Sequence, residues 1–267
     1  MNIRVMISLI ILIIILSLLL YNNSQISNIK ISKVNIESSK LKNSLRISQI
    51  TDFHSNDKID LGDLYNKLHE YNPHVIMLTG DIIDFKTRDL NLAFSLIDKL
   101  HELNKPIYYV SGNHELRNPL INEFHKGLMD RGVIIAEDKA LDLKINEDDI
   151  RILGAGFLYE SWDYNKLYED IDDISYNILL SHSPNRPIWY LHEEIDLILS
   201  GHTHGGQIRL PFVGGVVSPG EGLFPKYDKG IMEIDDNTLL YIDSGLGNSL
   251  LPIRFLNQVQ ISEIRIN

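Results

Sequence analysis

From Leu45 onward, short apolar runs alternate with patterns typical of amphipathic helices, and this alternation limits the possible folds more than any other feature of the chain. The first three runs predict strands over 45–51, 74–79 and 106–111, with helices over 61–71 and 90–103 between them. Strand–helix–strand units of this kind build largely parallel sheets, because parallel strands need a long crossover connection. We therefore predict an α/β fold.

Later apolar runs predict further strands over 133–136, 140–145, 150–155, 176–181, 196–200, 230–234, 239–242 and 259–264. After Gly205 the helical patterns stop, and glycine-rich turns separate the short apolar runs. We expect this last part to form a second sheet packed on the first. The predicted fold class is thus a two-sheet α/β sandwich.

An apolar run at the start of the chain stands apart from this domain. It covers Val5 to Leu20 and is interrupted only by Ser8 and Ser17. As a helix it would span about 24 Å, a little less than the hydrocarbon core of about 30 Å. No Ala-x-Ala-like site follows in 21–25, which favours a transmembrane signal anchor over a cleaved signal peptide. A buried core helix, apolar on every face, is the weakest of the three interpretations.

These observations divide the chain into a membrane anchor over 1–21, a tether over 22–44 and one domain over 45–267. The tether is rich in Asn, Ser and Lys, and it could end in an edge strand. Arg4 precedes the apolar run, while Lys30 and Lys33 follow it, so basic residues do not fix the orientation of the anchor.

The charge and the cysteine content exclude several classes of function. With 36 acidic and 25 basic residues, the chain has a formal net charge of −11, so nucleic acid is not expected as a partner. An anionic substrate would need a local source of positive charge. The absence of cysteine excludes disulfides, thiolate metal ligands and iron–sulfur clusters.

Polar side chains follow five of the predicted strands at the point where each strand ends. The blocks are Asp52-Phe53-His54, Gly80-Asp81, Gly112-Asn113-His114-Glu115, Ser181-His182 and Gly201-His202-Thr203-His204. Ligands of open α/β sheets bind at the carboxyl ends of strands, so these blocks should converge. Spacings of 29 residues from Asp52 to Asp81 and 32 from Asp81 to Asn113 place the three on neighbouring strands.

The side chains in these blocks suit a metal site. Five of the ten histidines fall within them, and residues two apart on extended backbone point the same way. Asp52 and His54 could therefore bind one ion together, and His202 and His204 could both face the site. Carboxylate, imidazole and amide oxygen suit Mn, Fe, Zn, Co or Ni better than Ca or Cu(I).

In this order, the five blocks resemble the signature blocks of the calcineurin-like metallophosphoesterase superfamily, over about 45–267. The resemblance implies two divalent metal ions, with the roles assigned as follows: Asp52, His54 and His204 hold one ion, Asn113, His182 and His202 hold the other, Asp81 bridges them, and His114 is the catalytic imidazole beside the leaving group. Two ions would make the site positive within an acidic protein and would allow a metal-activated hydroxide to attack phosphorus. Glu115 could orient His114 or close the turn.

Departures from other branches narrow the resemblance. Gly80-Asp81-Ile82-Ile83-Asp84 lacks the Asp-Arg-Gly element of serine/threonine phosphatases and the tyrosine of purple acid phosphatases. The anchor, Gly205-Gly206-Gln207, Gly220-Glu221-Gly222-Leu223-Phe224 and Gly245-Leu246-Gly247-Asn248 resemble the membrane-linked bacterial branch. That branch includes phosphatases and enzymes that cleave the pyrophosphate of UDP-2,3-diacylglucosamine. It implies location at the cell membrane with an extracytoplasmic domain.

We therefore expect a membrane-anchored dinuclear phosphoesterase whose phosphate-ester substrate could be lipid-linked. A pyrophosphatase acting on a nucleotide-linked lipid is the alternative enzyme, and a non-catalytic metal-binding module is the alternative outside enzymes. The apolar stretches 223–225 and 250–252 are interpreted as loop anchors packed on the second sheet rather than as a lipid-contacting lip. Gln207, Arg209 and Arg254 are not assigned catalytic roles.

Overall fold

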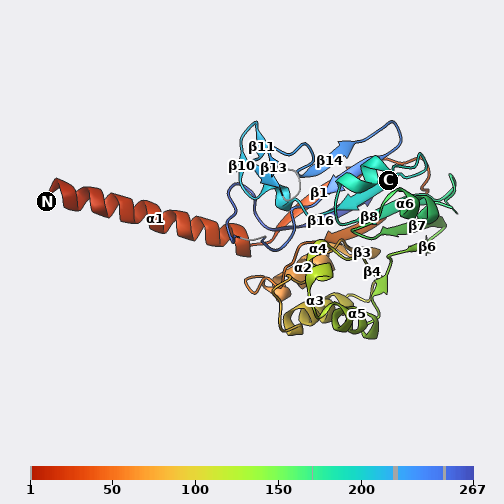
Figure 1. Cartoon of the computed structure of the whole chain (residues 1–267), viewed down its shortest axis with the longest axis horizontal. Coiled ribbons are helices and arrows are strands. Elements are labelled where there is room, and N and C mark those ends of the chain that lie inside the picture. Colours follow the sequence, from red (N-terminus) through yellow and green to blue (C-terminus); the bar gives the residue numbers. More distant parts are fainter. Residues whose placement is uncertain (1, 170, 219–221, 249–250) are drawn as a thin grey trace.

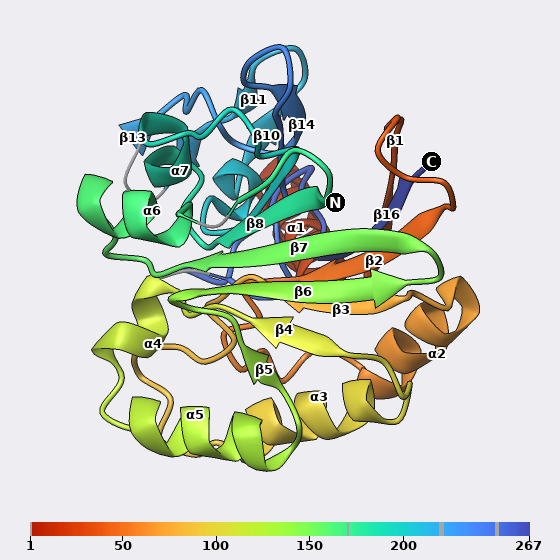
Figure 2. The same cartoon turned by 90° about the vertical axis from the view of Figure 1, so that its right-hand side faces the viewer.

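The computed structural model describes residues 2–169, 171–218, 222–248 and 251–267, and it places two six-stranded sheets face to face (Figures 1 and 2). The first sheet has the order β1 (Lys30–Ile36), β16 (Gln260–Ile266), β2 (Leu45–Ile50), β3 (Val75–Leu78), β4 (Ile107–Tyr109) and β5 (Ile134–Ile135). All neighbours in this sheet are parallel except β16 and β2.

The second sheet has the order β14 (Gly230–Glu233), β15 (Leu239–Ile242), β9 (Leu197–Ser200), β8 (Tyr176–Ser181), β7 (Asp148–Ala155) and β6 (Lys139–Ile145). Its four central strands are parallel, and its two edge strands are antiparallel to them. The expectation that the second sheet forms from the chain after Gly205 is wrong. The sheet begins at Lys139, and β16 returns to the first sheet because it pairs between β1 and β2.

Helices cover the outer faces of both sheets. On the first sheet lie α2 (Leu61–Tyr71), α3 (Asn91–His101) and α5 (Ile121–Asp130), and on the second lie α6 (Ser161–Leu167) and α7 (Asn185–Trp189) (Figure 2). Strand β3 shows why the layers form, since Val75 and Met77 are buried between the sheets while Ile76 and Leu78 are buried under the helices. The two-sheet α/β sandwich is thus confirmed.

Short elements join these layers at the carboxyl ends of the strands. They are α4 (Asn113–Arg117), the 3-10 turn η1 (His204–Gly206), and two small hairpins, β10 (Arg209–Leu210) with β11 (Gly214–Gly215) and β12 (Val217–Ser218) with β13 (Gly222–Leu223).

The N-terminal helix α1 (Ile3–Ser27) projects away from the sandwich (Figure 1). It is long and apolar enough to cross a membrane, and none of its most apolar 18-residue window is buried. The buried-core interpretation of this segment is therefore wrong. The helix continues through the first residues of the predicted tether, and β1 lies inside the tether as an edge strand paired with β16.

Candidate metal centre

The predicted site residues lie at the carboxyl ends of adjacent strands. Asp52 follows β2, Asp81 follows β3, and Asn113 begins the helix after β4, as the spacing predicted. His182 follows β8, and the segment with His202 follows its neighbour β9 in the second sheet. Both sheets therefore contribute side chains to one end of the sandwich.

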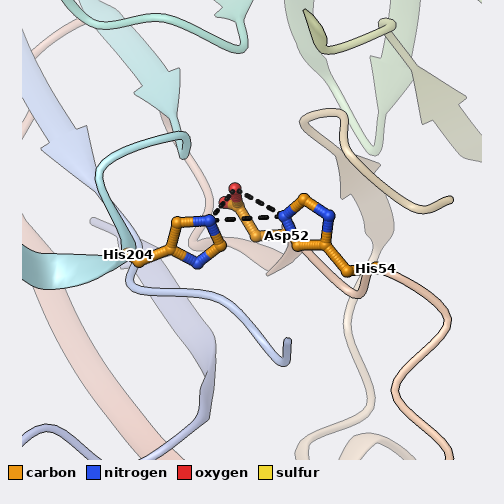
Figure 3. Close-up of side chains that lie close together, drawn as sticks. All are labelled: Asp52, His54 and His204. Atoms are coloured by element: carbon orange, nitrogen blue, oxygen red, sulfur yellow. Dashed lines mark hydrogen bonds and ion pairs between the residues drawn. The ribbon is translucent and has the colours of Figure 1, made fainter. Parts of the chain in front are cut away.

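A first cluster joins Asp52, His54 and His204, whose side chains point toward one another (Figure 3). The Nε2 atoms of the two imidazoles are 3.3 Å apart. Asp52 Oδ1 lies 3.5 Å from the His204 nitrogen and 3.8 Å from the His54 nitrogen. Three candidate ligand atoms from two loops, one after β2 and one after β9, thus surround one point.

A second cluster joins Asp81, His182 and His202. Asp81 Oδ2 lies 3.1 Å from His182 Nε2, which is 3.2 Å from His202 Nδ1. The same Asp81 oxygen lies 3.7 Å from His54 Nε2 in the first cluster. One carboxylate oxygen therefore stands between the two clusters.

The chemistry of these side chains fits divalent metal ions. Asn113 Oδ1 is buried and has no hydrogen-bond partner among the described residues, so its lone pairs remain for a cation. Burial lowers the pKa of His202 to about 4 and that of His204 well below its usual value, which keeps both imidazoles neutral as metal ligation requires.

The remaining groups form a tightly coupled set of charges. Burial by itself would raise the pKa of the Asp52 and Asp81 carboxyls, but the neighbouring imidazoles, chiefly His204 for Asp52 and His182 for Asp81, hold both pKa values well below the usual range. Burial by itself would lower the pKa of His54 and His182, but the carboxylates raise it to about 10 and about 9 respectively. Cations that bind here displace these protons.

The backbone is held in an unusual conformation at several of these residues. Left-handed φ angles between 48° and 71° occur at Asp52, His54, Asp81, His202 and His204. Such backbone costs on the order of 1–3 kcal/mol per residue and clusters at functional sites. The fold therefore holds these side chains in place at an energetic cost.

Neighbouring groups set the orientation of the candidate ligands. His182 Nδ1 lies 2.7 Å from the Thr79 carbonyl and donates to it, which leaves Nε2 facing Asp81. The His202 backbone N–H donates to both Asp52 carboxylate oxygens, at 3.2 and 3.0 Å. Each contact joins the loops of different strands.

Glu115 closes the turn rather than orienting the catalytic candidate. Its buried carboxylate accepts from the backbone N–H groups of Asp81, Ile82, Ile83 and Gly112, at 2.6–3.1 Å. It therefore ties the loop after β3 to the start of α4.

Asp84 is the site residue that sequence reasoning missed. Its Oδ2 lies 3.0 Å from His114 Nδ1 and 3.6 Å from His54 Nδ1. Burial would raise the pKa of Asp84, but its hydrogen bond to His114 and its close contact with His54 lower it well below the usual range. In the sequence, Asp84 stands out only as a departure from the pattern of purple acid phosphatases. Its position three residues after Asp81 was the available signal.

Gly201 lies where a larger residue would move a ligand. A Cβ atom there would overlap Thr51 Oγ1 and Asp52 Oδ2. We expect Gly201→Ala to destabilise the protein by about 1–3 kcal/mol, the usual cost of overpacking, and to weaken metal binding at the first cluster. Thermal unfolding and metal content per chain measure both effects.

Gly62→Ala is the matched control, because only the Asp60 side chain, at 3.1 Å, comes close to the added atom. Wild-type stability and metal content in Gly201→Ala would contradict the close approach of β2 and β9 at this point.

The arginines left without catalytic roles are held elsewhere. Arg254 is buried, and its guanidinium donates to the carbonyls of Ser244, Gly245 and Gly247. Arg209 pairs with Asp228 at 2.8 Å. Of the other sequence features noted, Gly220, Glu221 and Leu250 lie outside the described residues.

Comparisons with known proteins agree with this geometry. The profile of the calcineurin-like phosphoesterase family matches residues 45–206. The chain is 30% identical over 239 residues to the uncharacterized metallophosphoesterase Cj0846 of Campylobacter jejuni, and the match covers 84% of this chain but 60% of that protein. It is also 30% identical over 225 residues to the uncharacterized metallophosphoesterase YkuE of Bacillus subtilis, with 81% and 77% covered.

Among solved structures, the crystal structure of TT1561 of Thermus thermophilus is similar, with a TM-score of 0.53 and 13% identity. The likeness covers 76% of this chain and 91% of TT1561, and it extends to the fold alone.

Proposed function

Because this chain belongs to the calcineurin-like phosphoesterase family and is a metal-dependent hydrolase, we propose that it cleaves a phosphate ester at a dinuclear centre. Asp52, His54 and His204 would hold one ion, and Asn113, His182 and His202 the other, with Asp81 shared between them. The observation that carries this proposal is the position of Asp81 Oδ2, within 3.7 Å of His54 Nε2 and 3.1 Å of His182 Nε2.

When bound, the ions would lower the pKa of a coordinated water and stabilise charge on the phosphoryl oxygens. The contribution of the protein is to aim a proton donor at the same place. Asp84 accepts from His114 Nδ1 at 3.0 Å, and His114 Nε2 lies 4.0 Å from Asp81 Oδ2, on the side of the clusters. Protonated His114 would thus donate from Nε2 to the leaving oxygen, a role worth roughly 10²- to 10⁴-fold.

The further details of the proposal concern place and substrate. Helix α1 would anchor the protein in the cell membrane, with the domain over 45–267 on the extracytoplasmic side and residues 22–44 as the connection. A pyrophosphatase of the membrane-linked branch, acting on a nucleotide-linked lipid, is the second candidate. Its support is the apolar, unburied α1 together with the Gly245–Asn248 loop, whose Gly245 approaches Asp52 closely.

Removal of metal tests the proposed function directly. The full chain in detergent, stripped with a chelator, is expected to lose hydrolysis of bis-p-nitrophenyl phosphate and to regain it with Mn²⁺. Because the ions bind the folded state, metal at about a hundredfold excess over its Kd should also stabilise the protein by about 2.7 kcal/mol. Metal-binding without turnover of any phosphomonoester, diester or pyrophosphate would instead identify a non-catalytic module.

A further inference from the structure

Exposed apolar side chains gather on three segments at the side of the domain from which α1 leaves (Figure 1). We call them the apolar rim, which consists of Leu210, Phe212, Val213, Leu223, Phe224, Leu251, Ile253, Phe255 and Leu256. Leu223 is 70% exposed and Leu251 61%, so the interpretation of these stretches as anchors packed on the second sheet is wrong.

The three segments form one continuous surface. Phe255 exchanges backbone hydrogen bonds with Gln207 and Arg209, and Phe224 N–H donates to the Val216 carbonyl. Val216 N–H in turn donates to the Ile208 carbonyl. The rim therefore belongs to a hydrogen-bonded layer rather than to three independent loops.

The rim is fixed to the end of the apolar helix. The rings of Tyr21 and Phe255 meet edge to face at 5.6 Å, and Leu256 N–H donates to the Tyr21 hydroxyl at 3.1 Å. Asn22 donates to the Pro252 carbonyl and accepts from Arg254 N–H, both at 2.9 Å. Helix and rim thus keep one relative position.

This attachment sets the depth of the rim along α1. The helix turns from apolar to polar at Tyr21, an aromatic residue of the kind enriched at membrane–water interfaces. An apolar groove of about 310 Å³ lies between Ile15, Leu18 and Leu19 of the helix and Ile253 and Phe255 of the rim. The 251–256 segment of the rim therefore lies beside the last apolar turns of the helix, and the rest of the rim is joined to it by the backbone hydrogen bonds given above.

The charge of the same segments suits a membrane surface. Residues 208–217, 222–226 and 251–256 contain no Asp or Glu, although the whole chain has a net charge of −11. Lys226 is exposed on this surface. An anionic bilayer would be repelled by most of the protein but not here.

Asn257 connects this surface to the metal centre. Asn257 follows the rim directly, its N–H donates to Gln25 Oε1 of α1 at 3.1 Å, and its side chain donates to the His204 carbonyl at 2.6 Å. A ligand of the first cluster is therefore held against the base of the membrane helix.

We propose that the apolar rim is seated in the interfacial layer of the lipid bilayer that α1 crosses. We infer from this position that the metal centre is held at the membrane surface and acts on phosphate esters presented by membrane lipids. This second part rests on the proposed function. In this arrangement the domain keeps a fixed position at the membrane surface, whereas a flexible tether would let it move freely.

The absence of cysteine makes the first part directly testable with the full chain. Phe212→Cys and Ile174→Cys are each labelled with an environment-sensitive fluorophore and reconstituted in phosphatidylcholine–phosphatidylglycerol vesicles. Ile174 is the matched control, because it is 78% exposed and precedes β8, at the strand end opposite His182. We expect a blue shift and quenching by lipids spin-labelled near the headgroup at position 212, and neither at 174.

The same fluorescence shift and quenching at positions 212 and 174 would overturn the proposal that the rim lies in the bilayer. Protection of the 212 label that follows protein concentration rather than lipid would also overturn it, since the occupant would then be a second copy of the chain. Failure of the chain to remain with the vesicles would do the same.

A second measurement distinguishes the contact of the rim with the bilayer from the hydrolytic activity of the metal centre. Phe212→Ser is expected to lower turnover of vesicle-borne phosphatidic acid by roughly tenfold, the effect of withholding one large apolar side chain from an apolar phase. Turnover of soluble p-nitrophenyl phosphate should not change. An equal loss on both substrates would overturn the substrate assignment. If the unaltered chain hydrolyses neither of these monoesters and no phosphodiester or pyrophosphate, the proposed function fails, while the label experiment still decides whether the rim lies in the bilayer.

Discussion

Asp81→Asn is expected to lower kcat/KM by on the order of 10³-fold, because it removes the negative oxygen shared by both clusters. Asparagine keeps an oxygen that can accept the His114 backbone N–H, which donates to Asp81 Oδ1 at 2.8 Å, so the fold should be retained. Elemental analysis should show fewer than two ions per chain in the variant.

Asp98→Asn is the control for loss of one carboxylate, since Asp98 is exposed on α3 and its carboxylate pairs with Arg131, away from the clusters. Wild-type kinetics together with two bound ions in Asp81→Asn would remove the basis for a shared ligand.

His114→Ala is expected to reduce kcat by roughly 10²- to 10⁴-fold while both ions remain bound. The loss should depend on the leaving group. An alkyl phosphate ester, whose alkoxide needs a proton, should show the full effect, and a p-nitrophenyl ester, whose phenolate leaves readily, a much smaller one.

His69→Ala, on the exposed surface of α2, controls for removal of an imidazole. Asp84→Asn keeps His114 but removes the negative carboxylate that faces His114 Nδ1. The activity of this variant should therefore fall between that of the unaltered chain and that of His114→Ala. A loss in His114→Ala that is the same for both leaving groups would show that His114 does not act as a proton donor.

Much of the fold could be predicted because its elements have strong local patterns. The strands over Tyr176–Ser181 and Leu239–Ile242 and the helix over Leu61–Tyr71 have the bounds that the sequence predicted. Each combines an unbroken apolar run or an amphipathic period with turn residues at both ends.

The partners of the strands could not be predicted in the same way. The last strand, β16, pairs in parallel with β1 and antiparallel with β2, although all three carry similar apolar patterns. Pairing between strands that are far apart in the chain depends on which edges meet when the sheets assemble, and no local pattern records it.

The residues of the candidate site likewise fall into those that local sequence patterns predicted and those that depend on long-range contacts. The metal-ligand candidates could be named because each ends a strand, and strand order then places them together. Asp84 could not, since nothing around it in the chain shows that its carboxylate meets both His114 and His54. The role of Glu115 likewise depends on the loop after β3 meeting the start of α4.

The N-terminal helix shows the limit of sequence-based prediction most clearly. Local composition was sufficient to identify an apolar helix at the N-terminus and a set of candidate metal-binding side chains, because hydropathy and ligand chemistry belong to individual residues. Only tertiary contacts fixed the helix against the 251–257 loop and exposed the rim beside it. Such contacts join residues more than 200 positions apart, so they exist only once both sheets have formed.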